Sequence, residues 1–514
     1  MKKCFILFAM LIAFLLFSCS SSHSTNDTDI LPDSDADTQD WETVDDDSDS
    51  QSSEIVDDSE EQADIDSDEN EDGILEEDDS EENCNAEDEK DDDEEEIDDT
   101  DRINGYKRCY DEIPDEPYEG LFADPKIEIW IRGALHYDWD YEIQEEDLEK
   151  VTEIGLPVKD LRGVEKLVNL ESAEFFDTDG NIYDFTPLSK LKKLKKLRIS
   201  SESMTCLDGS FSFLTSLEAL KIENTQLKDV SPIEKLVNLV SLDLGYYNKL
   251  ESLPKNIGNL QKLESFNFPG NNIKDIKPLK SLTNLKKLFF HYNDVEDLSP
   301  IKCLVNLTHL GCENNKIKDI SPVTNLVNLT RLILIQNRIK EIPKEIVNLK
   351  KLQILQLDYN NIRNLPDLKG LDSLAELRLA YNKLNNDDFS KLNKLEIIGF
   401  LDISFNGITK VPVLKNVKSL YELYLVGNNI TDLTGFADNE SFPALRQLEL
   451  QYNKIENAEP LRKREGLSRL SIYNNCIKDV SPLEELQEKG THVSGINDQL
   501  DSCENTTITL GEGE

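Results

Sequence analysis

The sequence predicts an α/β solenoid: a right-handed superhelix of about fifteen rungs, with a parallel sheet on its concave side and a short helical cap at its N-terminal end. The first observation is a pattern of apolar residues and asparagine, LxxLxLxxNxI, which recurs in ten copies. Its asparagines, at 271, 293, 315, 337, 360, 382, 406, 428, 453 and 475, lie 22 to 25 residues apart, and such a fixed period indicates a repeat architecture. The second observation is length, because residues 102–514 exceed the size at which one compact core stops growing.

Each position of the repeat has a physical role. The L-x-L triplet alternates with a period of two, which predicts a short strand whose leucines face inward. The asparagine turns the chain out of the strand, and its amide can donate and accept hydrogen bonds along the stack. We expect the return segment, which often starts with Ser-Pro, to consist of 3₁₀ helix or irregular turns. Weaker copies bring the count to about fifteen, with strand cores at 154–156, 173–175, 197–199, 220–222 and 242–244.

The repeat length of 22 and the recurrent D-(I/V/L)-S-P turn resemble the internalin type of bacterial leucine-rich repeat proteins. The resemblance covers about residues 154–486. It implies the solenoid fold and a role in recognition, since this scaffold carries many unrelated binding activities. It does not identify the ligand.

The first residues have the features of an export signal. Lys2 and Lys3 precede an apolar run that is too short for a comfortable membrane span. The boundary Leu16-Phe17-Ser18-Cys19 resembles the lipobox of bacterial lipoproteins. That resemblance implies a lipoprotein signal peptide over 1–18, lipidation of Cys19 and, because Ser20 follows, sorting to the outer membrane. The alternative is an ordinary cleavable signal with a chance cysteine.

Residues 19–104 are expected to form a disordered tether rich in Asp, Glu and Ser. Within it, residues 26–101 contain 40 acidic side chains and one lysine, a net charge of −39 out of −49 for the chain. So much like charge and so little apolar surface oppose folding. The charge also argues against nucleic-acid binding, which needs Lys and Arg at the phosphates. A calcium-loop spacing that starts at Asp68 is expected by chance in such a segment.

Caps are expected at both ends, because a solenoid exposes apolar surface where it stops. Residues 105–153 form the predicted N-terminal cap, 154–486 the repeats, and 487–514 the C-terminal cap and tail. The cap contains a predicted helix after Asp124-Pro125 and a second one over 145–151, and residues 491–496 are a candidate for a final strand. The first helix presents one apolar face, made of Ile127, Trp130, Ile131, Ala134 and Leu135.

Seven cysteines remain once Cys4 and Cys19 are set aside, so at least one thiol is free. Cys312 takes an inward leucine position, which predicts a small buried hydrophobe. Cys476 and Cys503 lie at the C-terminal cap and form a possible disulfide, because an exported protein meets an oxidising compartment. A second possible pair joins residues 84 and 109, which would fasten the tether to the cap.

The sequence contains no motif for catalysis, a cofactor or a metal. It has no phosphate loop, no H-E-x-x-H, no G-x-S-x-G and no C-x-x-C. His309 and Cys312 are close in sequence, but strand parity directs them to opposite faces. We therefore expect no enzyme activity, no cofactor and no metal site.

A binding site is expected on the concave face, where alternate strand residues form columns across the rungs. A basic stripe of Lys287, His309 and Arg331 crosses it, and the outward apolar and aromatic residues beside the stripe favour a protein-binding surface. The predicted partner-binding residues are Lys287, Phe289, His291, His309, Arg331, Ile333, Ile335, Ile354, Tyr359, Phe400 and Tyr424. The alternative is that outward aliphatics merely suit a sheet, and that a tyrosine before the asparagine only shields the turn.

These observations together predict a lipid-anchored leucine-rich repeat protein of the bacterial cell envelope that binds a protein through its concave face. We expect a monomer that touches the membrane only through its lipid anchor. Two alternatives remain open: a structural envelope spacer without a specific ligand, and a secreted, non-lipidated effector or inhibitor.

Overall fold

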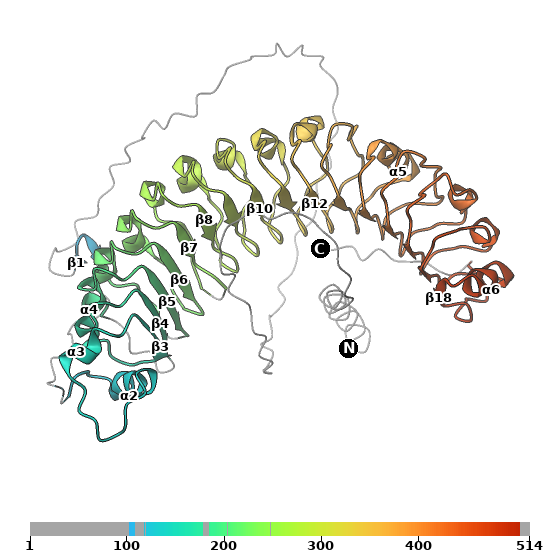
Figure 1. Ribbon diagram of the computed structural model, residues 1–514. Helices are drawn as coiled ribbons and strands as arrows, with labels where there is room; N and C mark the ends of the chain where they lie inside the picture. The colour runs from blue at the N-terminus through green and yellow to red at the C-terminus, as the bar shows by residue number, and fades with distance from the viewer. Residues whose placement is uncertain are drawn as a thin grey trace, which may run out of the picture. The chain divides into compact units, whose positions relative to one another are not determined.

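The computed structural model describes residues 102–107, 118, 120–177, 184–202, 204–246 and 248–503. The signal peptide, Cys19, almost all of the acidic segment and the possible pair of residues 84 and 109 lie outside the described residues. Within them, 16 parallel strands form a single sheet, and each strand pairs with the strands before and after it in sequence. Figure 1 shows the strands on the concave side of an arc and the helices and turns on its convex side. The predicted solenoid is confirmed.

The strands are short because each rung contributes little more than its L-x-L triplet. The predicted fifteen rungs correspond to β3–β17, and the predicted final strand is β18. The bounds are β3 Glu153–Pro157, β4 Ser172–Asp177, β5 Lys196–Ser201, β6 Ala219–Glu223, β7 Ser241–Asp243, β8 Ser265–Asn267, β9 Lys287–Phe289, β10 His309–Gly311, β11 Arg331–Ile333, β12 Ile354–Gln356, β13 Glu376–Arg378, β14 Phe400–Asp402, β15 Glu422–Tyr424, β16 Gln447–Glu449, β17 Arg469–Ser471 and β18 His492–Ser494.

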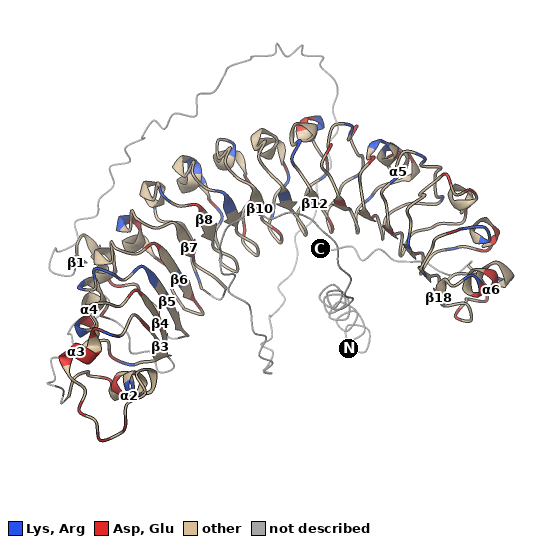
Figure 2. Ribbon diagram, in the orientation of Figure 1, with Lys and Arg blue, Asp and Glu red and all other residues tan. Residues whose placement is uncertain are grey.

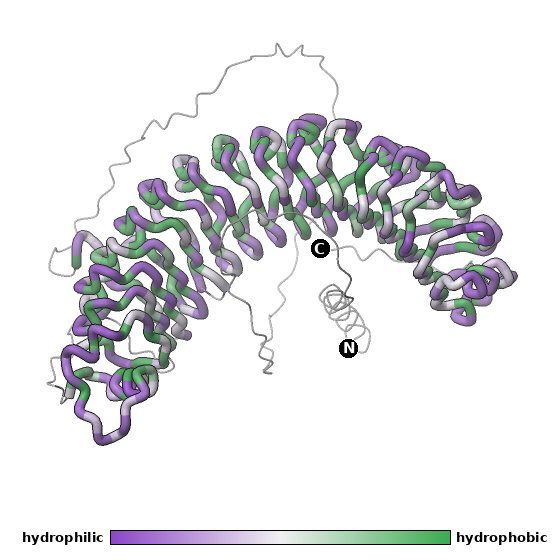
Figure 3. Tube along the Cα trace, viewed as in Figure 1, coloured by the Kyte–Doolittle hydropathy of each residue, from purple (hydrophilic) through white to green (hydrophobic). Residues whose placement is uncertain are grey.

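The core is one continuous apolar column inside the solenoid. Equivalent leucines stack in register, so that Leu288 pairs with Leu310 and Leu310 with Leu332. All three are fully buried. Because each rung stacks its apolar residues on those of its neighbours, the repeat period itself generates the core. Figure 3 shows the resulting alternation of hydrophobic and hydrophilic residues within each rung.

The convex side consists mainly of short 3₁₀ helices, as predicted. An aspartate two residues before the Ser-Pro serine holds the turn: the Asp319 carboxylate accepts hydrogen bonds from the Ser321 amide at 2.8 Å and from its hydroxyl at 2.7 Å. The convex elements are η2 Val164–Lys166, α4 Thr186–Ser189, η3 Gly209–Phe213, η4 Ser231–Lys235, η5 Ile257–Asn259, η6 Lys277–Ser281, η7 Ser299–Ile301, η8 Ser321–Asn325, η9 Lys344–Asn348, α5 Asn386–Lys391, η10 Leu392–Lys394, η11 Thr434–Phe436, η12 Glu459–Leu461 and α6 Ser481–Glu488.

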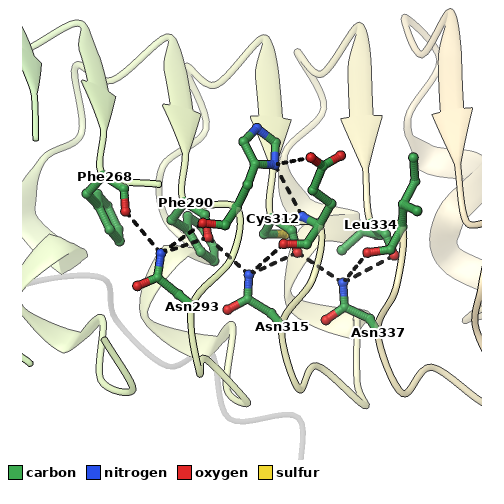
Figure 4. Close-up of polar contacts among 10 residues, drawn as sticks. Phe268, Phe290, Asn293, Cys312, Asn315, Leu334 and Asn337 are labelled. Atoms are coloured by element: carbon green, nitrogen blue, oxygen red, sulfur yellow. Dashed lines mark hydrogen bonds and ion pairs between the residues drawn. The ribbon is translucent and has the colours of Figure 1, made fainter. Parts of the chain in front are cut away.

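The repeat asparagine links neighbouring rungs through its buried amide. Asn315 Oδ1 accepts from the Val295 amide at 3.0 Å, and Nδ2 donates to the carbonyls of Phe290 at 3.0 Å and Cys312 at 3.2 Å. Two of these partners belong to the preceding rung. Figure 4 shows Asn293, Asn315 and Asn337 repeating the arrangement on three successive rungs. The predicted role of the asparagine is confirmed.

The N-terminal end is covered by two helices. In α2, Pro125–Ala134, the Asp124 carboxylate caps the first turn and Ile127 and Ile131 are buried, as predicted. Ala134 is exposed, so its predicted place on the apolar face was wrong. The second helix, α3 Glu145–Leu148, is shorter than predicted, because the chain must straighten into β3 a few residues later.

A hairpin lies where the sequence placed the boundary between tether and cap at residue 104. It consists of β1 Arg102–Ile103 and β2 Tyr106–Lys107. It packs on the convex turns of η3 and η4: Asn104 Nδ2 donates to Ser212 Oγ at 2.8 Å, and the Tyr106 hydroxyl donates to Glu234 Oε1 at 2.8 Å. Part of the predicted end cap therefore contacts the outer side of the solenoid.

The C-terminal end is closed by α6, β18 and a disulfide. Cys476 and Cys503 are bonded, with their Cα atoms 5.8 Å apart. Cys206 and Cys303 each take part in a disulfide bond, which the sequence did not predict. Cys312 is a buried free thiol, as predicted. None of the helices in the described part of the chain combines the length and the apolar composition that crossing a membrane requires.

Candidate binding surface

Eight of the predicted partner-binding residues come together on four adjacent rungs, β9–β12. The sheet register places Lys287, His309, Arg331 and Ile354 side by side on successive strands. Strands in a sheet are about 4.8 Å apart, so Lys287 and Arg331 originate about 10 Å from each other with His309 between them. A second row, Phe289, Gly311 and Ile333, runs parallel to the first.

Gly311 gives the second row its shape. A Cβ at this position would lie 2.4 Å from Cε1 of His291 and 2.6 Å from Cδ1 of Phe289, so both rings occupy the space that any side chain at 311 would need. The two rings stack with centroids 5.7 Å apart. We call Phe289 and His291 over Gly311 the ring platform. Ile333, paired with Gly311 on the next strand, and Ile335 extend the apolar surface beside it.

The imidazole of His291 is an uncharged part of this platform. Burial lowers the pKa of His291 to about 4. The backbone amide of Glu313 donates to Nδ1 of His291 at 3.3 Å, which requires that nitrogen to be unprotonated. The platform therefore presents two neutral rings at neutral pH.

The basic stripe carries two charges, not the three that its composition implied. Burial lowers the pKa of His309, and the neighbouring Lys287 and Arg331 cations lower it further, so His309 is mainly neutral at pH 7. Lys287 and Arg331 are exposed, and neither forms an ion pair with a residue that the structure describes. The other concave-face cations of β8–β17 are paired: Arg378 Nε lies 2.6 Å from Glu376 Oε1, and Arg469 Nε lies 3.8 Å from Glu449 Oε1.

Charge density alone does not mark this surface. Figure 2 shows basic and acidic residues interspersed along the whole arc. Among strands β8–β17, the distinguishing feature of β9–β12 is that its cations lack carboxylate partners among the described residues. The predicted apolar residues Phe289, Ile333, Ile335 and Ile354 are half-buried, so each offers only part of its side chain to a partner.

The structure does not bring Phe400 and Tyr424 to this surface. They lie on β14 and β15, where their ring centroids are 5.1 Å apart. The Arg378 guanidinium sits 4.6 Å above the Phe400 ring, and the Tyr424 hydroxyl donates to Glu422 at 3.2 Å. These side chains are engaged with one another, so β13–β16 form a separate, internally paired region of the concave face.

Tyr359 belongs to an aromatic ladder along the edge of the sheet. Its ring stacks on Tyr381 and that of Tyr381 on Phe405, with centroid separations of 4.1 Å in both cases. The next position is Gly427, whose absent side chain leaves room for the Phe405 ring. All four residues have positive φ and immediately precede a repeat asparagine. The structure thus favours the alternative interpretation for Tyr359, namely that it shields the turn.

Two buried carboxylates lie beneath the paired region. Asp358 Oδ1 accepts from the Ala380 amide at 2.8 Å, and Asp402 Oδ1 accepts from the Ser404 amide at 2.9 Å. Burial raises the pKa of both groups, and the Asp402 charge raises that of Asp358 further. The sequence pattern placed both residues in outward columns and gave no sign of their burial. In the described part of the chain, no cluster of three or more His, Cys, Asp or Glu side chains could hold a metal ion.

The fold is a leucine-rich repeat solenoid with a parallel concave sheet. The family model for a leucine-rich repeat region matches residues 297–483, and a second model, for two copies of the leucine-rich repeat, matches residues 261–303. The chain is also similar to adenylate cyclase of Schizosaccharomyces pombe, with 26% identity over 209 residues. That match covers 40% of this chain, which thus spans only a tenth of the curated relative's length.

Solved structures extend the comparison. A leucine-rich repeat protein of Leptospira interrogans is 26% identical with a TM-score of 0.60, over 69% of this chain and 98% of its own. The functional domain of InlJ from Listeria monocytogenes is 21% identical with a TM-score of 0.58, over 73% and 79% of the two chains. The plant peptide hormone receptor RGFR1, solved in complex with RGF2, is 19% identical with a TM-score of 0.52, over 68% and 61%. The last two likenesses show the fold alone.

Proposed function

We propose that this protein is a binding protein, not an enzyme, and that it recognises a protein partner through the concave surface of β9–β12. The observation that carries the proposal is the pair of exposed cations, Lys287 and Arg331, which have no carboxylate partner among the described residues and flank a preorganised apolar platform. Polar groups around a rigid apolar centre are typical of protein interfaces. The plant receptor of the same fold, solved with RGF2, supports a peptide or protein as the ligand class.

We further propose that the protein is anchored by a lipid on Cys19 in the bacterial cell envelope, at the outer membrane. The support is the sequence Leu16-Phe17-Ser18-Cys19 after a short apolar run, followed by Ser20. The acidic segment between Cys19 and the hairpin would extend by self-repulsion and give the solenoid reach from the membrane.

The binding proposal is tested with a double variant of the full chain, Arg331→Glu with Ile333→Glu. It places two carboxylates in the centre of the surface, and we expect at least a tenfold loss of the partner recovered by affinity capture from the producing cells. The matched control is Arg338→Glu with Val327→Glu, which makes the same change in net charge at exposed positions outside the concave columns. An unchanged set of partners in the first variant, with an unchanged unfolding temperature, would rule out this face.

The anchor is tested separately by Cys19→Ala. Loss of the proposed acylation site should move the protein from the membrane fraction to the soluble fraction after cell lysis, with no incorporation of labelled palmitate. Continued membrane association of the variant would refute lipid anchoring without bearing on the concave surface.

A further inference from the structure

We propose that the partner presents an extended acidic segment, in which two carboxylate side chains face Lys287 and Arg331 and an apolar side chain lies over the ring platform between Phe289 and Ile333. The inference rests on the proposed function, and it specifies the partner's chemistry. It predicts which peptides bind and how reversing the two surface charges changes that choice.

The charges of the surface set the first requirement. Lys287 and Arg331 are two strands apart, about 10 Å, and neither side chain has a carboxylate partner within the described chain. Carboxylates two or three residues apart on an extended chain are about 7–10 Å apart, so one segment can reach both cations. His309 between them is mainly neutral at pH 7, so covering it with an intervening apolar side chain does not remove a charge from water.

The ring platform sets the second requirement. The Phe289 and His291 rings are held against each other over Gly311, and Ile333 and Ile335 continue the surface on the next rung. An apolar side chain placed here would bury apolar surface. The platform would lose little conformational entropy on binding, because its packing already fixes both rings. A partner made only of charged residues would leave this surface in water.

The surroundings disfavour a nucleic acid as the polyanion. The Glu313 carboxylate lies 3.7 Å from Nδ1 of His291 at the edge of the platform, where a continuous phosphate backbone would meet it. Residues 102–514 contain 64 acidic and 52 basic side chains, a net charge of −12, so a long polyanion would be repelled outside the two cations. A short acidic peptide segment can confine its charge to the two positions.

The experiment selects random 12-residue peptides displayed on phage against the immobilised full chain, at about 0.15 M salt to screen non-specific charge effects. Peptides from the unmodified protein should be enriched in Asp and Glu spaced two or three residues apart around an aromatic or aliphatic residue. Lys287→Glu with Arg331→Glu should instead select peptides enriched in Lys and Arg. The matched control, Lys280→Glu with Lys344→Glu, changes the net charge equally on the convex turns η6 and η9 and should retain the acidic selection.

Synthetic copies of the selected peptides then give affinities. We expect at least a tenfold weaker Kd for the Lys287/Arg331 variant and an unchanged Kd for the control. If the selected peptides lack acidic residues but lose their binding in Ile333→Glu, the inference is overturned and the proposed function stands. If no selected peptide depends on Ile333, both fail. If a single-stranded oligonucleotide binds the unmodified protein but not the Lys287/Arg331 variant, the ligand is a nucleic acid and not an acidic peptide segment.

Discussion

At the scale of single residues, the two-residue period of a strand assigned most inward and outward positions in the ten strong repeats, but it placed Asp358 and Asp402 outward although both are buried. It placed Lys287, Phe289 and Arg331 outward and Cys312 inward, as the structure has them. It could not show that His309 is neutral or that Gly311 accommodates two rings. Both properties depend on side chains from neighbouring rungs, about 22 residues away in sequence, whose conformations the pattern does not specify.

Each repeat asparagine should contribute strongly to the free energy of unfolding. Asn315→Ala would leave the buried amide of Val295 without its acceptor and remove one of the two asparagine donors to each of the Phe290 and Cys312 carbonyls, so we expect a loss of about 1–3 kcal/mol in the free energy of unfolding. Denaturant unfolding measures this loss. The control is Asn306→Ala on the exposed side, whose amide makes a single bond to the Thr283 carbonyl at 2.9 Å and should cost less than about 1 kcal/mol.

Asp358 should make the stability of the solenoid depend on pH. Its pKa is raised to about 8 by burial and by Asp402, whereas an unfolded aspartate titrates near 3.9. Between these values the folded state holds a proton that the unfolded state releases, so stability falls as pH rises from about 4 to 8, by at most about 1.4 kcal/mol per pH unit. Asp358→Asn should flatten this slope in unfolding measured across that range, and the exposed Asp372→Asn should not. An unchanged slope in Asp358→Asn would contradict the raised pKa.

At the scale of elements, the strands, the convex 3₁₀ turns and helix α2 follow from local pattern, because each is determined by residues a few positions apart. The hairpin β1–β2 does not follow from local pattern. Its contacts with Ser212 and Glu234 join residues 108 and 128 positions apart, and no periodicity in the sequence relates them.

The hairpin contact depends on the small size of Gly209. A Cβ at this position would lie 2.4 Å from the Ile103 carbonyl oxygen, a distance that requires the backbone of the hairpin to move. We expect Gly209→Ala to displace β1–β2 and to accelerate amide hydrogen exchange in residues 102–107 at least tenfold. Gly133→Ala, where an added Cβ meets nothing within 4 Å, is the control and should leave that exchange unchanged. Equal protection in both variants would show that the hairpin does not rest on Gly209.

At the scale of the whole molecule, the fold was predictable because a solenoid is the sum of its repeats, each contacting mainly its neighbours. Because each rung contacts mainly its neighbours, loss of the terminal disulfide should destabilise mainly the rungs near the C-terminal end. Removing it with Cys476→Ala and Cys503→Ala opens a link between residues 27 positions apart and should cost roughly 3 kcal/mol. We expect faster hydrogen exchange in β17 and β18 and unchanged exchange in β9–β12. Uniform destabilisation along the sheet would contradict this picture of local coupling.

Photo-crosslinking in intact cells tests whether β9–β12 form the binding surface. A photoreactive amino acid would replace Ile333 in one version of the full chain and Lys344, on the convex turn η9, in another. We expect a discrete crosslinked product of higher mass from position 333 upon illumination and none from position 344. Crosslinking from position 344 alone, or from neither position, would contradict it.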